Sequence, residues 1–128
     1  MKQVLGVSKQ VNSWKDLEVW QVAHSLVLKV YKITGNFPSD ERFRLTDQIC
    51  RAAASIPTNI VEGKGRKSLK EYLQYLLLLA KDLSYLEKIN YDEIVGEYDR
   101  VSKMLNKLIG SLRTNLPLKT QNRKPITE

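Results

Sequence analysis

Residues 51–70 read RAAASIPTNIVEGKGRKSLK, and this stretch decides how the rest of the chain is interpreted. It opens with alanines and a serine, whose small side chains let a neighbouring helix come close. Pro57 follows within a pattern that stays apolar on both sides, at Ile56, Ile60 and Val61. Proline lacks a backbone donor and crowds the carbonyl four residues earlier, so the pattern predicts a helix that is kinked at Pro57.

The end of this stretch combines glycine with positive charge. Gly63 or Gly65 can adopt the left-handed conformation that ends a helix. The cations that follow form a basic loop: Lys64, Arg66, Lys67 and Lys70. The residues around the proline form a structural motif: Ser55, Pro57, Asn59, Glu62 and Gly63. Asn59 and Glu62 either bond backbone groups that the proline frees or orient the loop, and we favour the first role.

Upstream, apolar residues recur at three- and four-residue steps, which predicts a first helix. This helix begins near Leu17, after a cap at Ser13 or Asp16, and stops at residues 35–38, which read GNFP. Its predicted apolar stripe comprises Leu17, Trp20, Ala23, Val27, Val30 and Tyr31, widened by Val19 and Leu26. The helix is therefore expected to bury one broad face.

A second helix is predicted at about residues 40–63, with Ser39 as its cap and a break near residues 44–46, where Thr46 could cap a new start. Its predicted stripe comprises Phe43, Leu45, Ile49, Ala52, Ala53, Ile56 and Ile60. The lone cysteine, Cys50, lies beside this stripe, and we interpret it as buried packing.

Two more helices are predicted downstream. Ser68 and Glu71 have the spacing of a capping box, and the third helix runs from there to about Lys88. Asn90 is the predicted cap of the fourth helix, which ends before Leu116. The fourth helix carries a seam of the coiled-coil type: Ile94, Tyr98, Val101, Leu105, Leu108 and Leu112.

No stretch alternates over the length of a strand, so the chain is predicted to be all-α. Four helices with short connections favour an antiparallel up-down four-helix bundle. The predicted domain organisation is a flexible N-terminal arm at residues 1–12, the bundle at 13–116 and a disordered basic tail at 117–128.

The third helix is apolar nearly all round, although a surface helix needs only one apolar face. A second partner surface is therefore expected, and a homo-oligomer would provide it. The predicted oligomer interface comprises Tyr72, Tyr75, Leu76, Leu77, Leu78 and Leu79.

Composition limits the class of protein. The chain has 128 residues, enough for one domain with a core, and a formal net charge of +7. A single cysteine permits no disulfide within the chain, no apolar run is long enough to span a membrane, and residues 1–12 lack the apolar core of a secretory signal. We therefore expect a cytoplasmic protein without a membrane partner.

The positive charge is concentrated in residues 42–70, where seven basic residues face only Asp47 and Glu62, whereas residues 71–112 have a net charge of −2. A basic surface of this kind is typical of nucleic-acid binding, although charged runs are also common on solvated loops. The predicted phosphate contacts are, in order of preference, Arg66 and Lys67, then Lys64 and Lys70, then Arg51, Arg44 and Arg42.

Catalytic chemistry is not indicated. His24 is the sole histidine, and it has no evident partner that would make it a general base. The chain offers no set of matched metal ligands and no phosphate-binding glycine loop. We therefore predict no catalytic residues, no metal and no cofactor. Among the aromatic residues, Trp14 is the candidate for stacking on a base.

Several short motifs resemble those of a bacterial family, the 23S rRNA intervening-sequence proteins. They are Ser55-Ile56-Pro57, Asn59-Ile60, Glu62-Gly63 and Arg66, with Leu17-Glu18-Val19-Trp20, Phe37-Pro38, Leu45-Thr46 and Gln48 upstream. The resemblance covers roughly residues 14–112. It implies an up-down four-helix bundle, a ring-like homopentamer, a nucleic-acid partner and no catalytic residues.

The chain departs from that family in its third helix. It lacks the Gly-Ser pair and following glutamate that the family usually carries there, and the segment looks short by about two heptads. A bundle shortened on one side is expected, and the oligomer count becomes open. An alternative resemblance, to the accessory proteins of diversity-generating retroelements, implies a protein scaffold that partners a reverse transcriptase.

Overall fold

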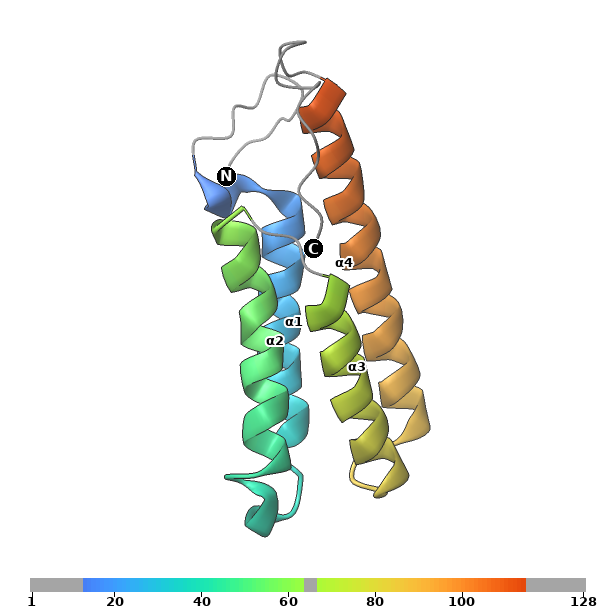
Figure 1. Cartoon of the computed structure of the whole chain (residues 1–128). Coiled ribbons are helices and arrows are strands. Elements are labelled where there is room, and N and C mark those ends of the chain that lie inside the picture. The colour runs from blue at the N-terminus through green and yellow to red at the C-terminus, as the bar shows by residue number, and fades with distance from the viewer. Residues whose placement is uncertain (1–12, 64–66, 115–128) are drawn as a thin grey trace.

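The structure is a computed structural model that describes residues 13–63 and 67–114 (Figure 1). The predicted arm, the predicted tail, Lys64, Gly65 and Arg66 lie outside these residues. Within them the chain is all-α and contains no strand, as predicted. The four α-helices are α1 (Glu18–Thr34), α2 (Leu45–Val61), α3 (Lys67–Asp82) and α4 (Lys88–Thr114). Two short 3-10 helices precede α1 and α2: η1 (Trp14–Asp16) and η2 (Ser39–Glu41).

The four helices enclose one hydrophobic core. α1 packs most extensively against α2, and α3 packs against both α2 and α4, while α4 also contacts α1. Figure 1 shows the α1–α2 and α3–α4 connections at the same, lower end of the molecule. The largest fully buried side chains come from all four helices: Tyr98, Leu26, Ile49, Leu73, Leu77, Ile94 and Val30.

The apolar stripe of α2 is buried as predicted, except at its first member. Leu45, Ile49 and Ile60 belong to the core, whereas Phe43 is 84% exposed. The prediction for Phe43 was wrong because the chain forms η2 and a turn before α2 begins at Leu45, so residue 43 is not in the helical register.

The buried face of α1 is rotated from the predicted stripe. Val19 and Leu26, which were expected only to widen it, are buried, whereas Tyr31 is exposed. Contacts with both α2 and α4 select this face, since α1 has a neighbour on each side.

α2 stays α-helical on both sides of Pro57, which is buried, although the proline nitrogen cannot donate its backbone bond. Side chains donate to backbone carbonyls around it: Asn59 Nδ2 to Ser55 O at 2.7 Å and Thr58 Oγ1 to Ala54 O at 2.9 Å. Gly63 follows with a φ of +74°, the left-handed conformation that favours glycine. The kink at Pro57 stays a prediction.

The ends of α3 and α4 differ from the predicted ones. α3 ends at Asp82 and α4 begins at Lys88, so the third helix does not reach Lys88 and Asn90 lies inside α4. Ser68 likewise lies inside α3, which begins at Lys67. Neither Asn90 nor Ser68 can therefore be a cap.

A local turn ends α3 early. Ser84 adopts a left-handed φ of 67°, and its amide donates to Lys81 O at 2.9 Å. The amide of Tyr85 donates to Ala80 O, also at 2.9 Å. This pair of bonds is a Schellman motif, which normally uses glycine at the left-handed position. A serine there leaves no glycine signal in the sequence.

Glu41 links the start of α2 to the connection between α3 and α4. Its Oε1 accepts the amide of Leu45 at 3.4 Å, at the start of α2, and its Oε2 accepts the Tyr85 hydroxyl at 2.8 Å. This hydrogen bond to a carboxylate raises the pKa of Tyr85. Ser39 and Thr46 were predicted to cap here, but Ser39 is the first residue of η2 and Thr46 already belongs to α2.

Candidate nucleic-acid interface

The predicted phosphate contacts do not form one site. Arg42 and Arg44 precede α2, and Lys67 follows it. A helix of 17 residues separates them by about 25 Å, at 1.5 Å per residue. The predicted set is therefore divided between the two ends of the molecule, with Arg51 on α2 between them.

Several of these cations are engaged in ion pairs. Lys70 Nζ lies 2.6 Å from Asp99 Oδ1, which connects the first turns of α3 to α4. Arg51 pairs with Asp47 at 3.0 Å. Lys67 contacts Glu71 only at 4.0 Å, and its side chain is 86% exposed. Of the described loop cations, Lys67 is thus the one with an open side chain.

The predicted oligomer interface on α3 is divided by burial. Leu76 and Leu77 are buried in the core of the single chain, so they offer no surface to a second copy, which corrects the prediction for both. Tyr72, Tyr75 and Leu78 are exposed. Leu79 is half-buried. We call the predicted interface residues within 72–79 the α3 apolar band. About half of this band therefore packs in the core of the single chain, and the other half remains on the surface.

The aromatic residues at the start of α1 pack on one another. The rings of Trp14 and Trp20 meet edge to face with centroids 4.9 Å apart, and His24 stacks on Trp20 at 4.8 Å. His24 therefore has a packing contact on an exposed part of α1. Trp14 remains partly exposed, so a base could still reach it.

α4 is longer than the helix beside it. The Lys70–Asp99 pair places the start of α3 next to Asp99, and α4 continues from there to Thr114 (Figure 1). Its seam is buried at Ile94, Tyr98 and Val101 but not at Leu112, which is 55% exposed. The expected shortening on one side is thus visible as a half of α4 without α3 beside it.

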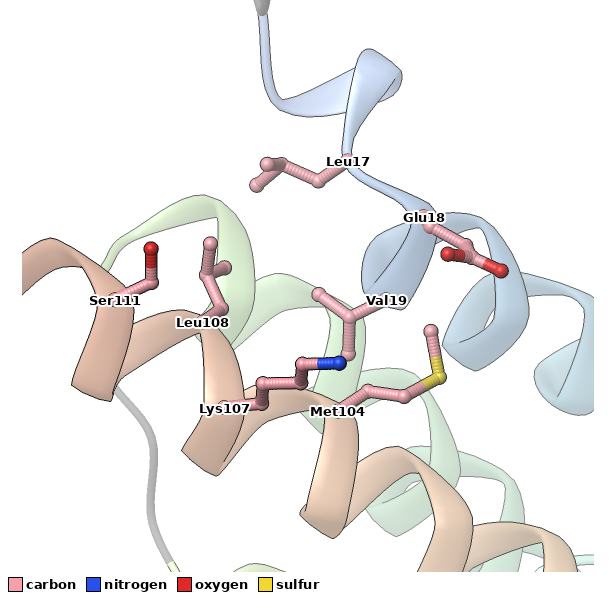
Figure 2. A pocket seen from close by; sticks show the side chains of 7 residues that line it. All are labelled: Leu17, Glu18, Val19, Met104, Lys107, Leu108 and Ser111. Carbon is pink, nitrogen blue, oxygen red and sulfur yellow. The ribbon is translucent and has the colours of Figure 1, made fainter. Parts of the chain in front are cut away.

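The second half of α4 packs against the start of α1 and leaves a groove of about 330 Å³ between them. Leu17 and Val19 line it from the α1 side, and Met104 and Leu108 from the α4 side (Figure 2). Lys107 and Glu18 add one charge of each sign. The earlier charge count over residues 71–112 overlooked this half of α4, because acidic residues before it balance its cations.

No group of His, Cys, Asp or Glu side chains within residues 13–63 and 67–114 is arranged to hold a metal ion. In the same residues, no helix is both long and apolar enough to cross a membrane. Cys50 is buried, with its Sγ 3.4 Å from Thr34 Oγ1.

The fold and these surfaces define an all-α, four-helix protein with cations at both ends and an exposed apolar face on α3. The chain belongs to the 23S rRNA-intervening sequence protein family, whose model matches residues 15–107. A search of curated proteins found no match.

Proposed function

We propose that this chain is a non-enzymatic, cytoplasmic protein that forms an antiparallel up-down four-helix bundle, assembles into a ring-like homo-oligomer and binds RNA or DNA. The observation that carries the nucleic-acid partner is the family match, since the family's name refers to a 23S rRNA intervening sequence. The shared lower position of the α1–α2 and α3–α4 connections supports the up-down arrangement (Figure 1).

The basic loop supports phosphate binding. Lys67 is exposed and is the first residue of α3, where free backbone amides and the positive end of the helix dipole favour an anion. Arg66 precedes it in the sequence. A ring would repeat this loop in every copy, and several weak sites on one particle bind a long polyanion with much greater avidity.

The exposed half of the apolar band on α3 supports assembly. Tyr72, Tyr75 and Leu78 leave contiguous apolar area in water unless a second copy covers it. We expect a native mass that is a multiple of the 14.8 kDa chain, five copies by resemblance to the family. Tyr75→Glu places a charge in this face, so it is expected to reduce the particle to single chains, measured by native mass spectrometry.

Tyr31→Glu is the matched control, because Tyr31 on α1 is 55% exposed and Tyr75 is 59% exposed. The control variant is expected to keep the native mass of the parent chain. A parent chain that is monomeric at micromolar concentration would contradict the assembly proposal, and so would an equal effect of the two substitutions.

Loop binding is tested by the salt dependence of affinity. Each phosphate neutralised adds about 0.7 to the slope of log affinity against log salt for single strands and about 0.9 for duplex DNA. Replacing Arg66 and Lys67 with alanine is therefore expected to flatten the slope by about 1.4 on a single-stranded RNA, measured by fluorescence anisotropy. An unchanged slope would remove the loop from the binding site.

A protein-interaction scaffold that partners a reverse transcriptase is the second candidate function. The observation that favours it is Phe43, which is 84% exposed between Arg42 and Arg44. Aromatic residues and arginine are enriched at protein–protein interfaces. Co-purification of a reverse transcriptase, lost in a Phe43→Ala variant, would favour this function over nucleic-acid binding.

A further inference from the structure

The charges of α4 are separated along its length. Residues 88–99 hold four acidic residues and a single lysine, whereas residues 100–114 hold four basic residues and no acidic one. The acidic half lies beside α3 and the later part of α1, and the basic half extends beyond the start of α3 (Figure 1). The helix therefore has a negative half beside α3 and a positive half that lies beyond the start of α3 and packs against the start of α1.

The acidic half uses its charges within the fold. Glu93 Oε2 accepts from Lys29 Nζ at 2.8 Å, and Glu97 lies 3.7 Å from the same lysine. This contact with Glu93, followed by the field of Glu97, raises the pKa of Lys29 against the opposing effect of burial. Asp99 pairs with Lys70. These carboxylates connect α4 to α1 and to α3.

Three cations of the basic half have no comparable partner among the described residues. Arg100, Lys103 and Lys107 are exposed, and no ion pair joins any of them to another described residue of the chain. Glu18 lines the same groove as Lys107, and the two side chains do not form an ion pair (Figure 2). Outside the described residues, the sequence contains a single acidic residue, Glu128.

These three cations share one face of the helix. They follow one another at steps of three and four residues, which places them in a row about 10 Å long. We call Arg100, Lys103 and Lys107 the α4 basic face. It faces away from the core, because the apolar seam residues Val101 and Leu105 point to the other side.

Compensation of the helix dipole does not explain this face. That effect is confined to the last turn of a helix, and α4 ends at Thr114, far beyond Arg100 and Lys103. Stabilising ion pairs within the helix do not explain it either. Asp99 lies four residues before Lys103 and Glu97 lies three before Arg100, but Asp99 pairs with Lys70 and Glu97 with Lys29.

We propose that the α4 basic face binds the phosphate backbone of nucleic acid and is the chain's principal phosphate-binding surface; this inference rests on the proposed nucleic-acid function. The other exposed residues on that side of the basic half are small or polar: Asn106, Gly110 and Ser111. A protein interface or a membrane surface requires apolar area among the charges, whereas a phosphate backbone requires only cations. The face therefore fits a polyanion.

The test compares two double variants with the same net charge. Lys103→Gln with Lys107→Gln removes two members of the face. Lys32→Gln with Lys88→Gln removes two exposed lysines from the other end of the molecule. Both variants are expected to fold, because glutamine has about the same helix propensity as lysine. Lys88→Gln removes only an exposed ion pair with Asp92. Circular dichroism and thermal unfolding check this.

Affinity of the full chain for a short single-stranded RNA and for its duplex is measured between about 50 and 200 mM salt. For the face variant, the slope of log affinity against log salt is expected to be smaller than that of the parent chain, by about 1.4 on the single strand, and to be smaller on the duplex also. The control variant is expected to keep the parent slope. Adding Arg100→Gln to the face variant is expected to lower the slope again.

The outcomes separate the inference from the proposed function. If the parent chain binds RNA and the face variant keeps its slope, or loses no more than the control, the α4 basic face is not the site although the function stands. If the parent chain binds neither RNA, both proposals fail. Binding of the parent chain to vesicles of anionic lipid but not to RNA would also overturn both.

Discussion

Replacing Leu77 with alanine is expected to lower the free energy of unfolding by about 2–5 kcal/mol, the range for truncating a buried leucine. Leu77 is 1% exposed and packs in the core formed by all four helices. The substitution removes apolar contacts and leaves a cavity that its neighbours fill only in part. Since domains of this size are stable by about 5–15 kcal/mol, the change removes a large fraction of the total. Urea denaturation followed by circular dichroism measures it.

Leu78→Ala is the matched control, because the next residue along the chain is the same type but is 37% exposed. We expect it to lower the free energy of unfolding by less than about 1 kcal/mol, as is usual for surface positions. Leu78 lies on the proposed assembly face, so both variants are measured at two protein concentrations to separate folding from association. Similar losses for the two leucines would contradict the division of the α3 apolar band. If the alanine variant does not fold, Leu77→Met is measured in its place. This substitution keeps the volume of the side chain and is expected to lower the free energy of unfolding by less than about 1.5 kcal/mol.

Replacing Tyr98 with phenylalanine is expected to stabilise the chain. Tyr98 is 1% exposed, and its buried hydroxyl has no hydrogen-bond partner among the described residues. A buried polar group without a partner destabilises a fold by about 1–3 kcal/mol, so its removal is expected to raise the free energy of unfolding by about 1 kcal/mol at neutral pH. Urea denaturation of the two proteins measures the difference.

The stabilising effect of Tyr98→Phe is expected to be larger at alkaline pH. Burial raises the pKa of the Tyr98 hydroxyl, and the negative charge of Glu97 raises it further. The unfolded chain releases this proton from about pH 10, whereas the folded chain retains it, so the folded state loses stability as the pH rises above 10. This contribution reaches about 1.4 kcal/mol per pH unit and is absent from Tyr98→Phe. The stability difference between variant and parent is therefore expected to increase above pH 10.

Tyr31→Phe provides the control, because the Tyr31 side chain is exposed on α1, outside the proposed assembly face. It is expected to leave the stability of the parent chain unchanged at neutral pH and in alkali. A Tyr98→Phe variant that is less stable than the parent at pH 7 would show that the hydroxyl has a partner. A constant difference across the alkaline range would contradict the raised pKa.

The local sequence pattern predicted the buried side chains correctly where a helix has a well-defined apolar periodicity. The stripe from Leu45 to Ile60 and the early seam of α4, from Ile94 to Val101, are buried as expected. The local sequence pattern did not predict the connections between helices correctly. There, hydrogen bonds between side chains and residues distant in the sequence hold the helix ends in place. Glu41 accepts bonds from Leu45 and from Tyr85, and nothing in the adjacent sequence indicates the second partner.

The candidate site was predicted less well than the fold. Proximity in the sequence suggested that Arg42, Arg44 and Lys67 act together, but α2 holds them at opposite ends. A charge sum over residues 71–112 concealed the basic half of α4. Separate charge counts before and after Asp99 would have shown that the helical segment after Asp99 has no acidic residue. Only the structure explains the position of this boundary, because the start of α3 lies beside Asp99.

The sequence alone determined that this chain is all-α with four helices, because the three- and four-residue recurrence of apolar side chains is a local property of each segment. Tertiary structure decided which surfaces remain available. α1 and α3 became the neighbours of α4, so Lys29 and Lys70 pair with its carboxylates while Arg100, Lys103 and Lys107 stay in solvent. Burial and ion pairing depend on which segments meet in space, and the order of residues along the chain does not specify those meetings.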